Sequence, residues 1–362
     1  MRKRFVIAGG GTGGHIFPAI AIANAIKHRQ PDADILFIGA EGKMEMEKVP
    51  QAGYPIKGIS IAGFNRSSLI KNITLPFKLI KSFLQVRSIF NSFKPDTVIG
   101  VGGYSSFPVL RYAQQKGIDT FIHEQNSFAG KSNRLLGKRA VKIFVATDGM
   151  EKFFPSHKTI LVGNPVRSVI ADSFITKDQG TKHFGLRTDK KVLLSIGGSL
   201  GAKSINEAVE LGLDKLNQTN IQLIWQTGKS YEKRATQAAG NSSSIWVGAF
   251  IREMEYALAA ADVVISRAGA MSIAELCISG KPSIFVPYPY AAEDHQTVNA
   301  MKLVDKNAAC MITDKEAGDK LIDQALELLA NKERQQSFHI AMQASAIKNA
   351  DLLIANQIIE SN

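Results

Sequence analysis

Residues 3–15 read KRFVIAGGGTGGH, a short apolar run that passes directly into five glycines and a histidine. Residues 191–202 read KVLLSIGGSLGA and repeat the same pattern in the second half of the chain. A glycine turn after a strand lets the backbone approach a phosphate at the N-terminus of the following helix. Each stretch therefore predicts the first strand, turn and helix of a Rossmann-like domain.

Further β-branched, apolar runs follow both openings, each succeeded by glycine or polar residues and a helix-length stretch. Strands that alternate with helices predict a parallel, doubly wound sheet. Because the runs lack polar alternation, we expect strands that are covered on both faces. The expected strands are Phe5–Ala8, Ile35–Ile38, Thr97–Val101, Thr120–His123, Lys142–Val145 and Thr159–Val162, then Val192–Ile196, Gln222–Trp225, Ile245–Val247, Val263–Ser266, Ser283–Val286 and Ala309–Ile312. Residues 320–360 predict helices and no final strand.

Two such openings in 362 residues predict an α/β protein with two Rossmann-like, doubly wound domains that face each other across a cleft. We expect the joint at Gly163-Asn164-Pro165-Val166, where Pro165 stops the preceding strand. The N-terminal domain then covers residues 1–163 and the C-terminal domain covers residues 164–340.

The charge of the chain is strongly one-sided. Residues 1–165 hold 23 Lys and Arg against 10 Asp and Glu, whereas residues 166–362 hold 21 against 22. A basic surface confined to one half predicts a polyanion or an anionic membrane as its partner. Zinc-ligand spacing, an RNA-binding aromatic signature and a basic low-complexity tail are all missing from the sequence, which argues against nucleic acid.

Apolar runs in the sequence are too short for membrane insertion or secretion. No run approaches the 18 or so apolar residues of a membrane-spanning helix, and the run at Phe5–Ala8 is too short for a signal peptide. We therefore expect a cytoplasmic protein. Cys277 and Cys310 lack metal-ligand spacing, so we expect both to be buried as small apolar side chains.

The first glycine loop admits more than one interpretation. Gly9, Gly11 and Gly14 match the dinucleotide fingerprint, with Glu41 as a candidate ribose acid, so an NAD(P) dehydrogenase is one alternative. A second glycine loop in the other half does not fit a single-cofactor enzyme, and a turn without any ligand is a further alternative. His15 is a candidate general base at the start of a helix; a role in capping the helix or orienting the loop is equally open.

Residues 262–275, DVVISRAGAMSIAE, predict a buried strand, a turn at Gly269 and a helix whose N-terminus suits a diphosphate. Glu275 lies one turn into that helix, where a carboxylate can accept hydrogen bonds from the two ribose hydroxyls. A solvent-facing acid in the first turn is the alternative. Gln296 follows another expected strand and is a candidate sugar-binding residue. Asp294 and His295 are adjacent in sequence, which disfavours a metal site.

Several segments together resemble one family. They are Gly11-Thr12-Gly13-Gly14-His15, Gly102-Gly103-Tyr104, His123-Glu124-Gln125-Asn126, Gly163-Asn164-Pro165-Val166-Arg167, Gly197-Gly198-Ser199-x-Gly201-Ala202, Arg267-x-Gly269-Ala270 and Gln296-x-x-Asn299-Ala300. In this order they resemble the motifs of the MurG family, the bacterial UDP-N-acetylglucosamine–lipid I N-acetylglucosaminyltransferases. The similarity runs from about residue 5 to residue 310.

The resemblance implies a GT-B fold and the transfer of N-acetylglucosamine (GlcNAc) from UDP-GlcNAc to the 4-hydroxyl of N-acetylmuramic acid (MurNAc). The acceptor is lipid I, the undecaprenyl-diphosphate-linked MurNAc-pentapeptide, and the reaction inverts the anomeric centre to give lipid II for peptidoglycan. No metal or other cofactor is expected. Helix N-termini and Arg167 are then expected to neutralise the departing UDP.

Site residues carried over from the family fall into two groups. The implied donor-binding residues are Thr12, Gly13, Gly14, Asn126, Arg167, Ser199, Ile251, Ala270, Met271, Ser272, Ile273, Ala274, Glu275 and Gln296. Phe250 and Ile251 are expected to hold uracil through backbone atoms, and Glu275 to hold the ribose. Tyr104, His123 and Glu124 are expected on the acceptor side with His15.

Two segments depart from the family pattern, and one returning helix is implied. Met271-Ser272-Ile273-Ala274 replaces a Leu-Thr-Val-Ser run, and the residues that flank Gln296 also differ from some members. Backbone contacts to phosphate survive the first change, whereas the second leaves the sugar contacts less defined. The resemblance also implies that a C-terminal helix, about residues 341–362, packs back on the N-terminal domain.

A basic amphipathic stretch begins near Leu69 and continues after Pro76. Apolar residues recur there at helical spacing beside lysine and arginine, which is typical of an interfacial helix on anionic lipid. A helix that packs its apolar face on the sheet is the alternative, and both can hold at once. The expected membrane contacts are Phe77, Lys78, Ile80, Lys81 and Phe83, with Leu84 as an alternative to Phe83.

The expected partners are UDP-GlcNAc, lipid I, an anionic membrane surface and other cell-wall and division proteins, but no nucleic acid. The expected location is peripheral, at the cytoplasmic face of the bacterial plasma (inner) membrane. The alternatives are a diacylglycerol glycosyltransferase, a UDP-GlcNAc epimerase and a non-catalytic UDP-sugar-binding scaffold.

Overall fold

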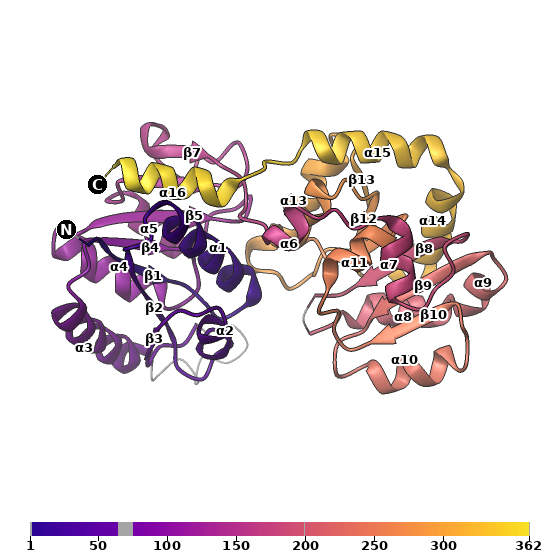
Figure 1. Ribbon diagram of the computed structural model, residues 1–362, viewed down its shortest axis with the longest axis horizontal. Helices are drawn as coiled ribbons and strands as arrows, with labels where there is room; N and C mark the ends of the chain where they lie inside the picture. The colour runs from indigo at the N-terminus through magenta and orange to yellow at the C-terminus, as the bar shows by residue number, and fades with distance from the viewer. Residues whose placement is uncertain (1, 64–74, 199, 362) are drawn as a thin grey trace. The chain divides into compact units, whose positions relative to one another are not determined.

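The computed structural model describes residues 2–63, 75–198 and 200–361 of the chain. The chain forms two compact units (Figure 1): the first unit comprises Met1–Val166 with Asn349–Asn362, and the second comprises Arg167–Lys348. The sequence places the return to the first unit at about residue 341. It begins at Asn349 instead, because α15 (Lys332–Ala344) packs against other helices of the second unit.

The first unit contains a parallel sheet in the order β3-β2-β1-β4-β5-β6-β7. Its strands are β1 (Arg4–Ala8), β2 (Asp34–Ala40), β3 (Ile56–Ile59), β4 (Thr97–Gly100), β5 (Asp119–Glu124), β6 (Lys142–Val145) and β7 (Thr159–Leu161). In the register, Phe5 of β1 lies between Ile35 of β2 and Thr97 of β4. The strand order reverses between β1 and β4, which is where ligands bind in open sheets of this kind.

Helices cover both faces of this sheet. They can do so because β1 carries apolar side chains on both of its faces. Phe5 and Ile7 enter one hydrophobic cluster, whereas Val6 and Ala8 enter another. The first cluster includes α1 (Gly13–Arg29), α2 (Glu45–Gln51) and α16 (Ala350–Glu360). The second includes α3 (Leu75–Phe93), α4 (Ser106–Gln115) and α5 (Lys131–Gly137). A short 3-10 helix, η2 (Ser156–Lys158), precedes β7.

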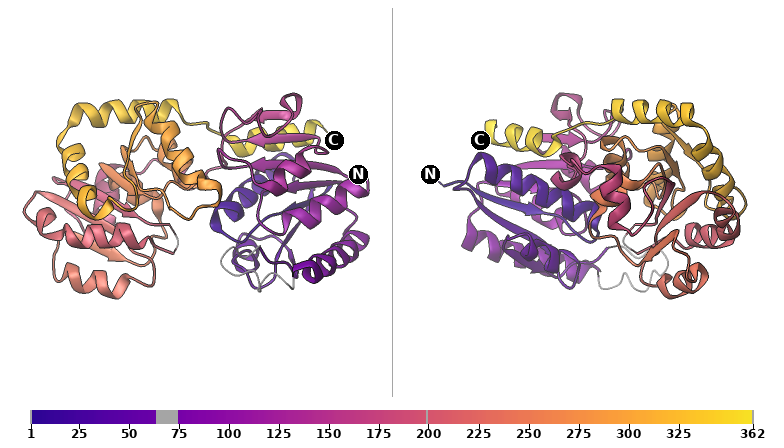
Figure 2. Two further views of the ribbon diagram at one scale, coloured as in Figure 1. Left: turned by 180° about the vertical axis from the view of Figure 1, so that it is seen from behind. Right: turned by 45° about the vertical axis from the view of Figure 1, so that its right-hand side comes forward.

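The last helix of the chain completes the core of the first unit. Ile354, Ala355 and Ile358 of α16 are buried together with Ile22 and Ile26 of α1. Both termini therefore lie in the first unit, and the yellow α16 runs beside the indigo α1 in Figures 1 and 2. The C-terminal helix α16 is thus part of the unit that the N-terminal half of the chain forms.

The second unit repeats the plan with a parallel sheet in the order β10-β9-β8-β11-β12-β13. Its strands are β8 (Lys191–Ile196), β9 (Ile221–Gln226), β10 (Ile245–Gly248), β11 (Val263–Ser266), β12 (Ser283–Phe285) and β13 (Ala309–Met311). Its helices are α6 (Ser168–Ala171), α7 (Lys177–His183), α8 (Lys203–Leu211), α9 (Leu213–Asn217), α10 (Glu232–Ala239), α11 (Met254–Ala260), α12 (Ala270–Ile278), η3 (Ala292–Asp294), α13 (His295–Val304), α14 (Ala317–Ala330) and α15. Here the strand order reverses between β8 and β11.

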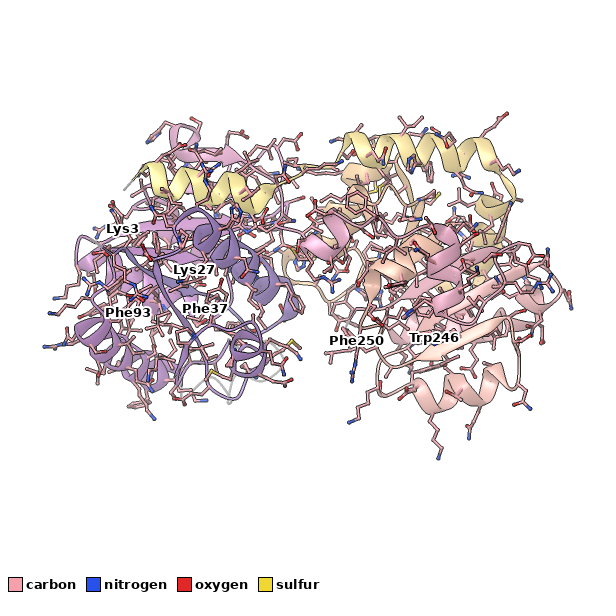
Figure 3. All side chains as sticks on the ribbon, viewed as in Figure 1. Lys3, Lys27, Phe37, Phe93, Trp246 and Phe250 are labelled. Atoms are coloured by element: carbon pink, nitrogen blue, oxygen red, sulfur yellow. The ribbon has the colours of Figure 1, made fainter. Side chains whose placement is uncertain are left out.

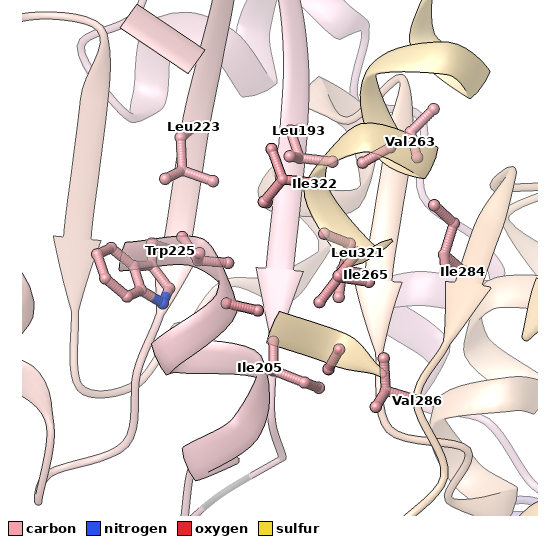
Figure 4. Packing of buried hydrophobic residues seen from close by; sticks show 14 of the residues in the cluster. Leu193, Ile205, Leu223, Trp225, Val263, Ile265, Ile284, Val286, Leu321 and Ile322 are labelled. Carbon is pink, nitrogen blue, oxygen red and sulfur yellow. The ribbon is translucent and has the colours of Figure 1, made fainter. Parts of the chain in front are cut away.

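A large apolar cluster fills one side of the second sheet. Leu193, Ile265 and Leu321 meet there, from β8, β11 and α14 (Figure 4). Trp225 of β9 is fully buried at the edge of this cluster, and its indole N–H donates to Asn206 Oδ1 of α8 at 3.0 Å. The hydrogen bond satisfies the polar atom of a side chain that otherwise contributes only apolar surface.

The prediction of two Rossmann-like α/β domains is confirmed, and each expected strand overlaps an observed one. Strand β3 was not expected. Its sequence IKGI contains an exposed lysine and a glycine, so its pattern lacks the continuous apolar run of the central strands. Edge strands are covered on fewer sides and need less apolar sequence. Among the described residues, no helix is both long enough and apolar enough to span a bilayer.

Candidate functional site

The first glycine loop ends at a helix N-terminus that suits an anion. Thr12 is the N-cap of α1, with extended backbone and no side-chain cap bond, and it is exposed. No acidic residue occupies the first turn, which Gly13 and Gly14 begin. The first N–H groups of a helix have no partner inside the helix, so they attract negative charge. Half-buried His15 lies in the same turn.

The loop between β4 and α4 packs against this turn through its own glycines. Gly102 and Gly103 have φ values of 86° and 85°, a region that favours glycine. A Cβ on Gly103 would lie 2.2 Å from the carbonyl oxygen of Gly10. A Cβ on Gly102 would lie 2.8 Å from Nδ1 of His15. The two glycines therefore leave the room that the first glycine loop and the His15 ring occupy.

Tyr104 follows these glycines and is 51% exposed. Its ring covers Gly63, because a Cβ there would lie 2.0 Å from Tyr104 Cζ. Its Cε2 atom, on the other edge of the ring, lies 4.0 Å from the Cβ position of Gly11. Tyr104 thus lies beside the glycine loop with part of its ring open to solvent, which suits contact with a ligand.

His123, near the end of β5, is completely buried. Its Nε2 lies 3.0 Å from the carbonyl oxygen of Gly163, and Nδ1 lies 3.2 Å from Nε2 of Gln125. Burial lowers the His123 pKa to about 4, while the bond to Gly163 opposes this shift and the neighbouring His15 adds to it. The ring is therefore neutral at pH 7, and it supports the loop from beneath.

Glu124 organises the loop between β5 and α5. One carboxylate oxygen accepts from the backbone N–H and the side-chain amide of Asn126, at 3.1 and 3.3 Å. The other accepts from Gly130 N–H at 3.2 Å and from Asn133 Nδ2 at 2.9 Å. The side chain is buried, so its charge is distributed over four donors in the protein. In this geometry Glu124 positions Asn126, which is half-buried.

Glu45, which the sequence analysis did not single out, joins the first glycine loop to β2. Its Oε2 accepts the N–H of Gly11 and its Oε1 accepts the N–H of Ala40, both at 2.9 Å. The residue is only 1% exposed. A buried carboxylate already occupies a loop amide that a dinucleotide phosphate would need, and its charge would repel that phosphate. This arrangement argues against the dehydrogenase alternative.

In the second unit, α12 begins directly after β11 and presents a comparable helix N-terminus. Gly269 is its extended N-cap, and its first turn carries no acidic residue. The side chains of residues 270–275 are half-buried along this turn. Because β11 adjoins β8 at the reversal of the strand order, this N-terminus lies where a ligand of such a sheet binds.

Glu275 of α12 forms an ion pair with Arg167, the first residue of the second unit. Arg167 Nε donates to Glu275 Oε1 at 2.9 Å, and both side chains are largely buried. Burial raises the pKa of Glu275, and Arg167 partly offsets that rise. The solvent-facing alternative for Glu275 is therefore wrong: its side chain is 16% exposed.

Ile251, after β10, is held by a residue that sequence reasoning also missed. Gln226 at the end of β9 accepts the N–H of Ile251 at 3.0 Å and donates to the carbonyl oxygen of Gly198 at 3.0 Å. It thereby joins the second glycine loop to the loop after β10. Phe250, labelled in Figure 3, is 51% exposed beside buried Ile251. Ser199 lies outside the described residues.

Gln296 of α13 is fixed by the preceding loop, because its Oε1 accepts the N–H of Tyr288 at 3.0 Å. Arg267, at the end of β11, holds the same loop from beneath. It donates to the carbonyl oxygens of Val286 and Pro287, each at 3.0 Å, and it pairs with Asp314. These contacts engage the guanidinium group within the protein. They stabilise the ends of the neighbouring strands β11, β12 and β13.

The outer side of α3 carries three exposed apolar side chains. Phe77 is 73% exposed, and Ile80 and Leu84 are each 62% exposed. Their spacing puts them on one face of the helix. Phe83, in contrast, packs against the core of the first unit. Of the two alternatives in the sequence, Leu84 rather than Phe83 lies on the exposed face.

The predicted site residues are divided between the units, at the carboxyl ends of their sheets. Thr12, Gly13, Gly14, His15, Tyr104, His123, Glu124 and Asn126 belong to the first unit. Arg167, Ile251, residues 270–275 and Gln296 belong to the second. Glu45 and Gln226 belong to no recognisable motif. The role of a single buried polar residue becomes apparent only from its hydrogen-bond partners. Within the described ranges, no cluster of His, Cys, Asp and Glu is arranged to hold a metal.

Known families match both units of the chain. Residues 5–145 match the glycosyltransferase family 28 N-terminal domain. Residues 192–357 match the glycosyltransferase family 28 C-terminal domain. The two matches cover the glycine loops and the strand ends that carry the candidate site.

Relatives match almost the full chain. A protein of Phocaeicola vulgatus is 51% identical over 360 residues, covering 99% of this chain and 96% of the relative. One of Cytophaga hutchinsonii is 48% identical over 357 residues, covering 99% and 96%. Both are named UDP-N-acetylglucosamine–N-acetylmuramyl-(pentapeptide) pyrophosphoryl-undecaprenol N-acetylglucosamine transferase. The crystal structure of Acinetobacter baumannii MurG is similar with a TM-score of 0.78 at 27% identity, covering 99% of this chain and 100% of that one.

Proposed function

The chain belongs to glycosyltransferase family 28, and on this premise we propose that it transfers GlcNAc from UDP-GlcNAc to the MurNAc of undecaprenyl-diphosphate-linked MurNAc-pentapeptide. It is an N-acetylglucosamine transferase of the peptidoglycan-precursor type, as the names of its full-length relatives state. The observation that supports these donor and acceptor substrates is the pair of helix N-termini at the two strand-order reversals. Neither helix has an acidic residue in its first turn.

The donor site is assigned to the second unit. Ribose and diphosphate are consecutive parts of UDP, so their protein partners must be neighbours. Glu275 and Arg167 meet this condition, since their side chains are 2.9 Å apart. Glu275 then accepts the ribose hydroxyls, while Arg167 and the amides of residues 270–274 receive the diphosphate. Gln296 binds the sugar, and Ile251 binds uracil through its carbonyl oxygen, because its N–H is donated to Gln226.

Departure of UDP places negative charge on the diphosphate as the bond to the sugar breaks. Fixed helix amides and a guanidinium group stabilise such charge without having to reorganise. This stabilisation lowers the activation barrier for the departure of UDP. The chemistry therefore requires no metal ion at the diphosphate. Thr12, Gly13, Gly14 and Asn126, also assigned to the donor by the family resemblance, complete this set from the first unit.

The acceptor side is assigned to the first unit. His15 removes the proton from the 4-hydroxyl of MurNAc as that oxygen attacks the anomeric carbon. Direct displacement inverts this carbon and yields a β-1,4 bond. Tyr104 offers a half-exposed ring to the acceptor, whereas buried His123 and Glu124 hold the loop that carries Asn126. That the two domains face each other across a cleft stays a prediction.

Attachment to the membrane is proposed to be peripheral, at the cytoplasmic face of the bacterial plasma membrane. The support is the exposed face of α3 formed by Phe77, Ile80 and Leu84, with Lys78 and Lys81 alongside. The excess of basic residues in the first half of the sequence adds attraction to anionic lipid. Other cell-wall and division proteins as partners stay a prediction.

Radiolabelled GlcNAc transfer to a lipid I analogue in the presence of EDTA tests the proposal, with UDP-glucose as the control donor. We expect labelled lipid from UDP-GlcNAc only. Binding of UDP-GlcNAc without transfer would contradict the assignment and favour the non-catalytic scaffold. Transfer to diacylglycerol, or conversion of UDP-GlcNAc without any acceptor, would identify the other two alternatives.

A further inference from the structure

We propose that Gln125 is a positioning residue that holds the His15 imidazole with its proton on Nδ1, so that Nε2 presents a lone pair to the acceptor hydroxyl. The inference rests on the proposed function only in taking His15 as the base. Gln125 directly follows β5, contacts His123 through its side-chain amide and is 3% exposed. It is part of the segment His123-Glu124-Gln125-Asn126, but no role follows for it from the sequence.

The orientation of the Gln125 amide is fixed by two acceptors. Its Nε2 donates to the carbonyl oxygen of Val101 at 2.8 Å, and a carbonyl can only accept. The same Nε2 lies 3.2 Å from Nδ1 of His123. The Nε2 of His123 faces the carbonyl oxygen of Gly163 at 3.0 Å, so that nitrogen carries the hydrogen.

A neutral imidazole has one donor nitrogen and one acceptor nitrogen. Because burial lowers the pKa of His123 to about 4, the ring is neutral at pH 7 and its Nδ1 accepts. Both neighbours of the Gln125 amide nitrogen are therefore acceptors. Turning the amide by 180° would set its oxygen against two acceptors, so the amide has a single favourable orientation.

In this orientation the Gln125 oxygen lies beside Gly102, as does the His15 ring. Gln125 Oε1 is buried, and no donor of the described residues hydrogen-bonds to it. It lies 3.5 Å from the position that a Cβ on Gly102 would occupy, and His15 Nδ1 lies 2.8 Å from the same position. Because Gly102 has no side chain, the buried Gln125 oxygen and the His15 ring both border the small space that a Cβ would occupy.

A buried acceptor favours a donor on the facing group. The His15 tautomer with hydrogen on Nδ1 supplies that donor and leaves the Nε2 lone pair for the reaction. When the acceptor oxygen bonds to the anomeric carbon, its proton moves to His15 Nε2, and the electron pair of the broken bond leaves with UDP. The resulting imidazolium keeps its Nδ1–H toward Gln125, which stabilises the charged form.

Other titratable groups lie on the elements packed around His15. They are His123 on β5, Tyr104 in the loop after β4, and Glu45 of α2, whose oxygens are held by Gly11 and Ala40. His123 is neutral and Glu45 is oriented toward backbone amides. Gln125 Oε1 is a buried acceptor beside the same glycine as His15 Nδ1, and we assign the selection of the His15 tautomer to it on this ground.

The test is ¹⁵N NMR of the full-length protein labelled at histidine, with His15→Asn to assign the signals. We expect the His15 shifts of a ring protonated on Nδ1 in the unmodified protein. Gln125→Met keeps the length of the side chain but removes its acceptor. We expect it to populate the Nε2–H tautomer, to lower kcat at least tenfold with an unchanged KM for UDP-GlcNAc, and to move the acidic limb of the kcat profile to lower pH.

Gln114→Met is the matched control. Gln114 also donates through Nε2, to Thr120 Oγ1 and to the carbonyl oxygen of Leu136, but it lies on α4 away from His15. We expect it to leave the His15 signals and kcat unchanged. If Gln125→Met does not fold, Gln125→Glu supplies the test: a carboxylate facing His15 should move the acidic limb to higher pH.

The outcomes separate this inference from the proposed function. Unchanged His15 signals in a folded Gln125→Met protein, or an unmoved acidic limb in Gln125→Glu, would overturn the role of Gln125. If His15→Asn retains full turnover, His15 is not the base and that assignment fails. A tautomer change in Gln125→Met would still support the structural relationship between Gln125 and His15 in that case.

Discussion

The carboxylate of Glu45 accepts the backbone N–H of Gly11 at 2.9 Å, inside the first glycine loop. Its second oxygen holds Ala40 N–H at the end of β2. The sequence of this loop suggests a phosphate site, but a carboxylate of the protein itself already accepts one of the loop N–H groups. The charge and the lost donor both oppose a dinucleotide there, whereas the turn at Gly13 and Gly14 stays available to an anion.

Replacing Glu45 by glutamine should destabilise the protein. An amide NH₂ would face one of the two backbone N–H donors, which leaves that donor buried without a partner at a cost of about 1–3 kcal/mol. Urea unfolding followed by circular dichroism measures the change. Glu47→Gln on the same helix is the control, since Glu47 is exposed, and its midpoint should not move. An unchanged midpoint in Glu45→Gln would contradict the role of this carboxylate.

Removing the imidazole of His15 should slow the reaction without weakening donor binding. A histidine base contributes about 10²–10⁴-fold, so His15→Ala should lower kcat by a factor in this range. Turnover with a lipid I analogue, together with calorimetric titration of UDP-GlcNAc, measures the two effects separately. His157→Ala, at an exposed position in η2, should change neither. Full turnover in His15→Ala would leave His15 with a structural role.

Loss of the Glu275 carboxylate should weaken UDP-GlcNAc binding. Hydrogen bonds to a charged group contribute about 1.5–3 kcal/mol, so Glu275→Ala should raise Kd roughly 10- to 100-fold. Glu327→Ala is the control in the same unit, because it removes an exposed ion pair with Arg334 from α14, a helix that carries none of the donor residues. Donor affinity that survives Glu275→Ala would remove this residue from the ribose role.

The same carboxylate gives donor binding a pH dependence. Burial raises the Glu275 pKa above 4.5, and Arg167 only partly offsets this. As pH falls, Glu275 therefore becomes protonated sooner than an ordinary glutamate, and donor affinity should fall with it. Calorimetric Kd values for UDP-GlcNAc between pH 7 and pH 5 measure the slope. Glu275→Gln should show a weaker dependence; an identical slope would assign the effect to another group.

Polar substitutions on the exposed face of α3 should reduce membrane binding while preserving the fold. Phe77→Ser with Ile80→Ser removes two apolar side chains that are 73% and 62% exposed, and binding to anionic vesicles should fall about tenfold or more. Cosedimentation with phosphatidylglycerol vesicles measures it. Phe174→Ser, 95% exposed in the second unit, should not alter binding. Phe83→Ser should instead lower stability, because Phe83 packs on the core.

The motifs and the apolar periodicity of the sequence determined the architecture of this protein. Continuous apolar strands such as Val263–Ser266 can be stable only when both faces are covered, so their order along the chain predicts doubly wound sheets. Glycines at residues 102 and 103 and the turn before His15 similarly predict the strand ends that carry the site, because few other residues adopt that backbone. Strand β3 escaped prediction, since an edge strand needs little apolar sequence.

Only the tertiary structure decided which polar side chains hold these loops in place. Glu45 and Gln226 belong to none of the sequence motifs, and Gln125 belongs to one that gives it no role. Each acquires its role from donors or acceptors that lie far along the chain. Tertiary packing also selected Leu84 over Phe83 for the exposed face of α3. Apolar burial follows a local period that a sequence displays, whereas a buried hydrogen bond depends on the distance between two specific atoms, which only the folded chain defines.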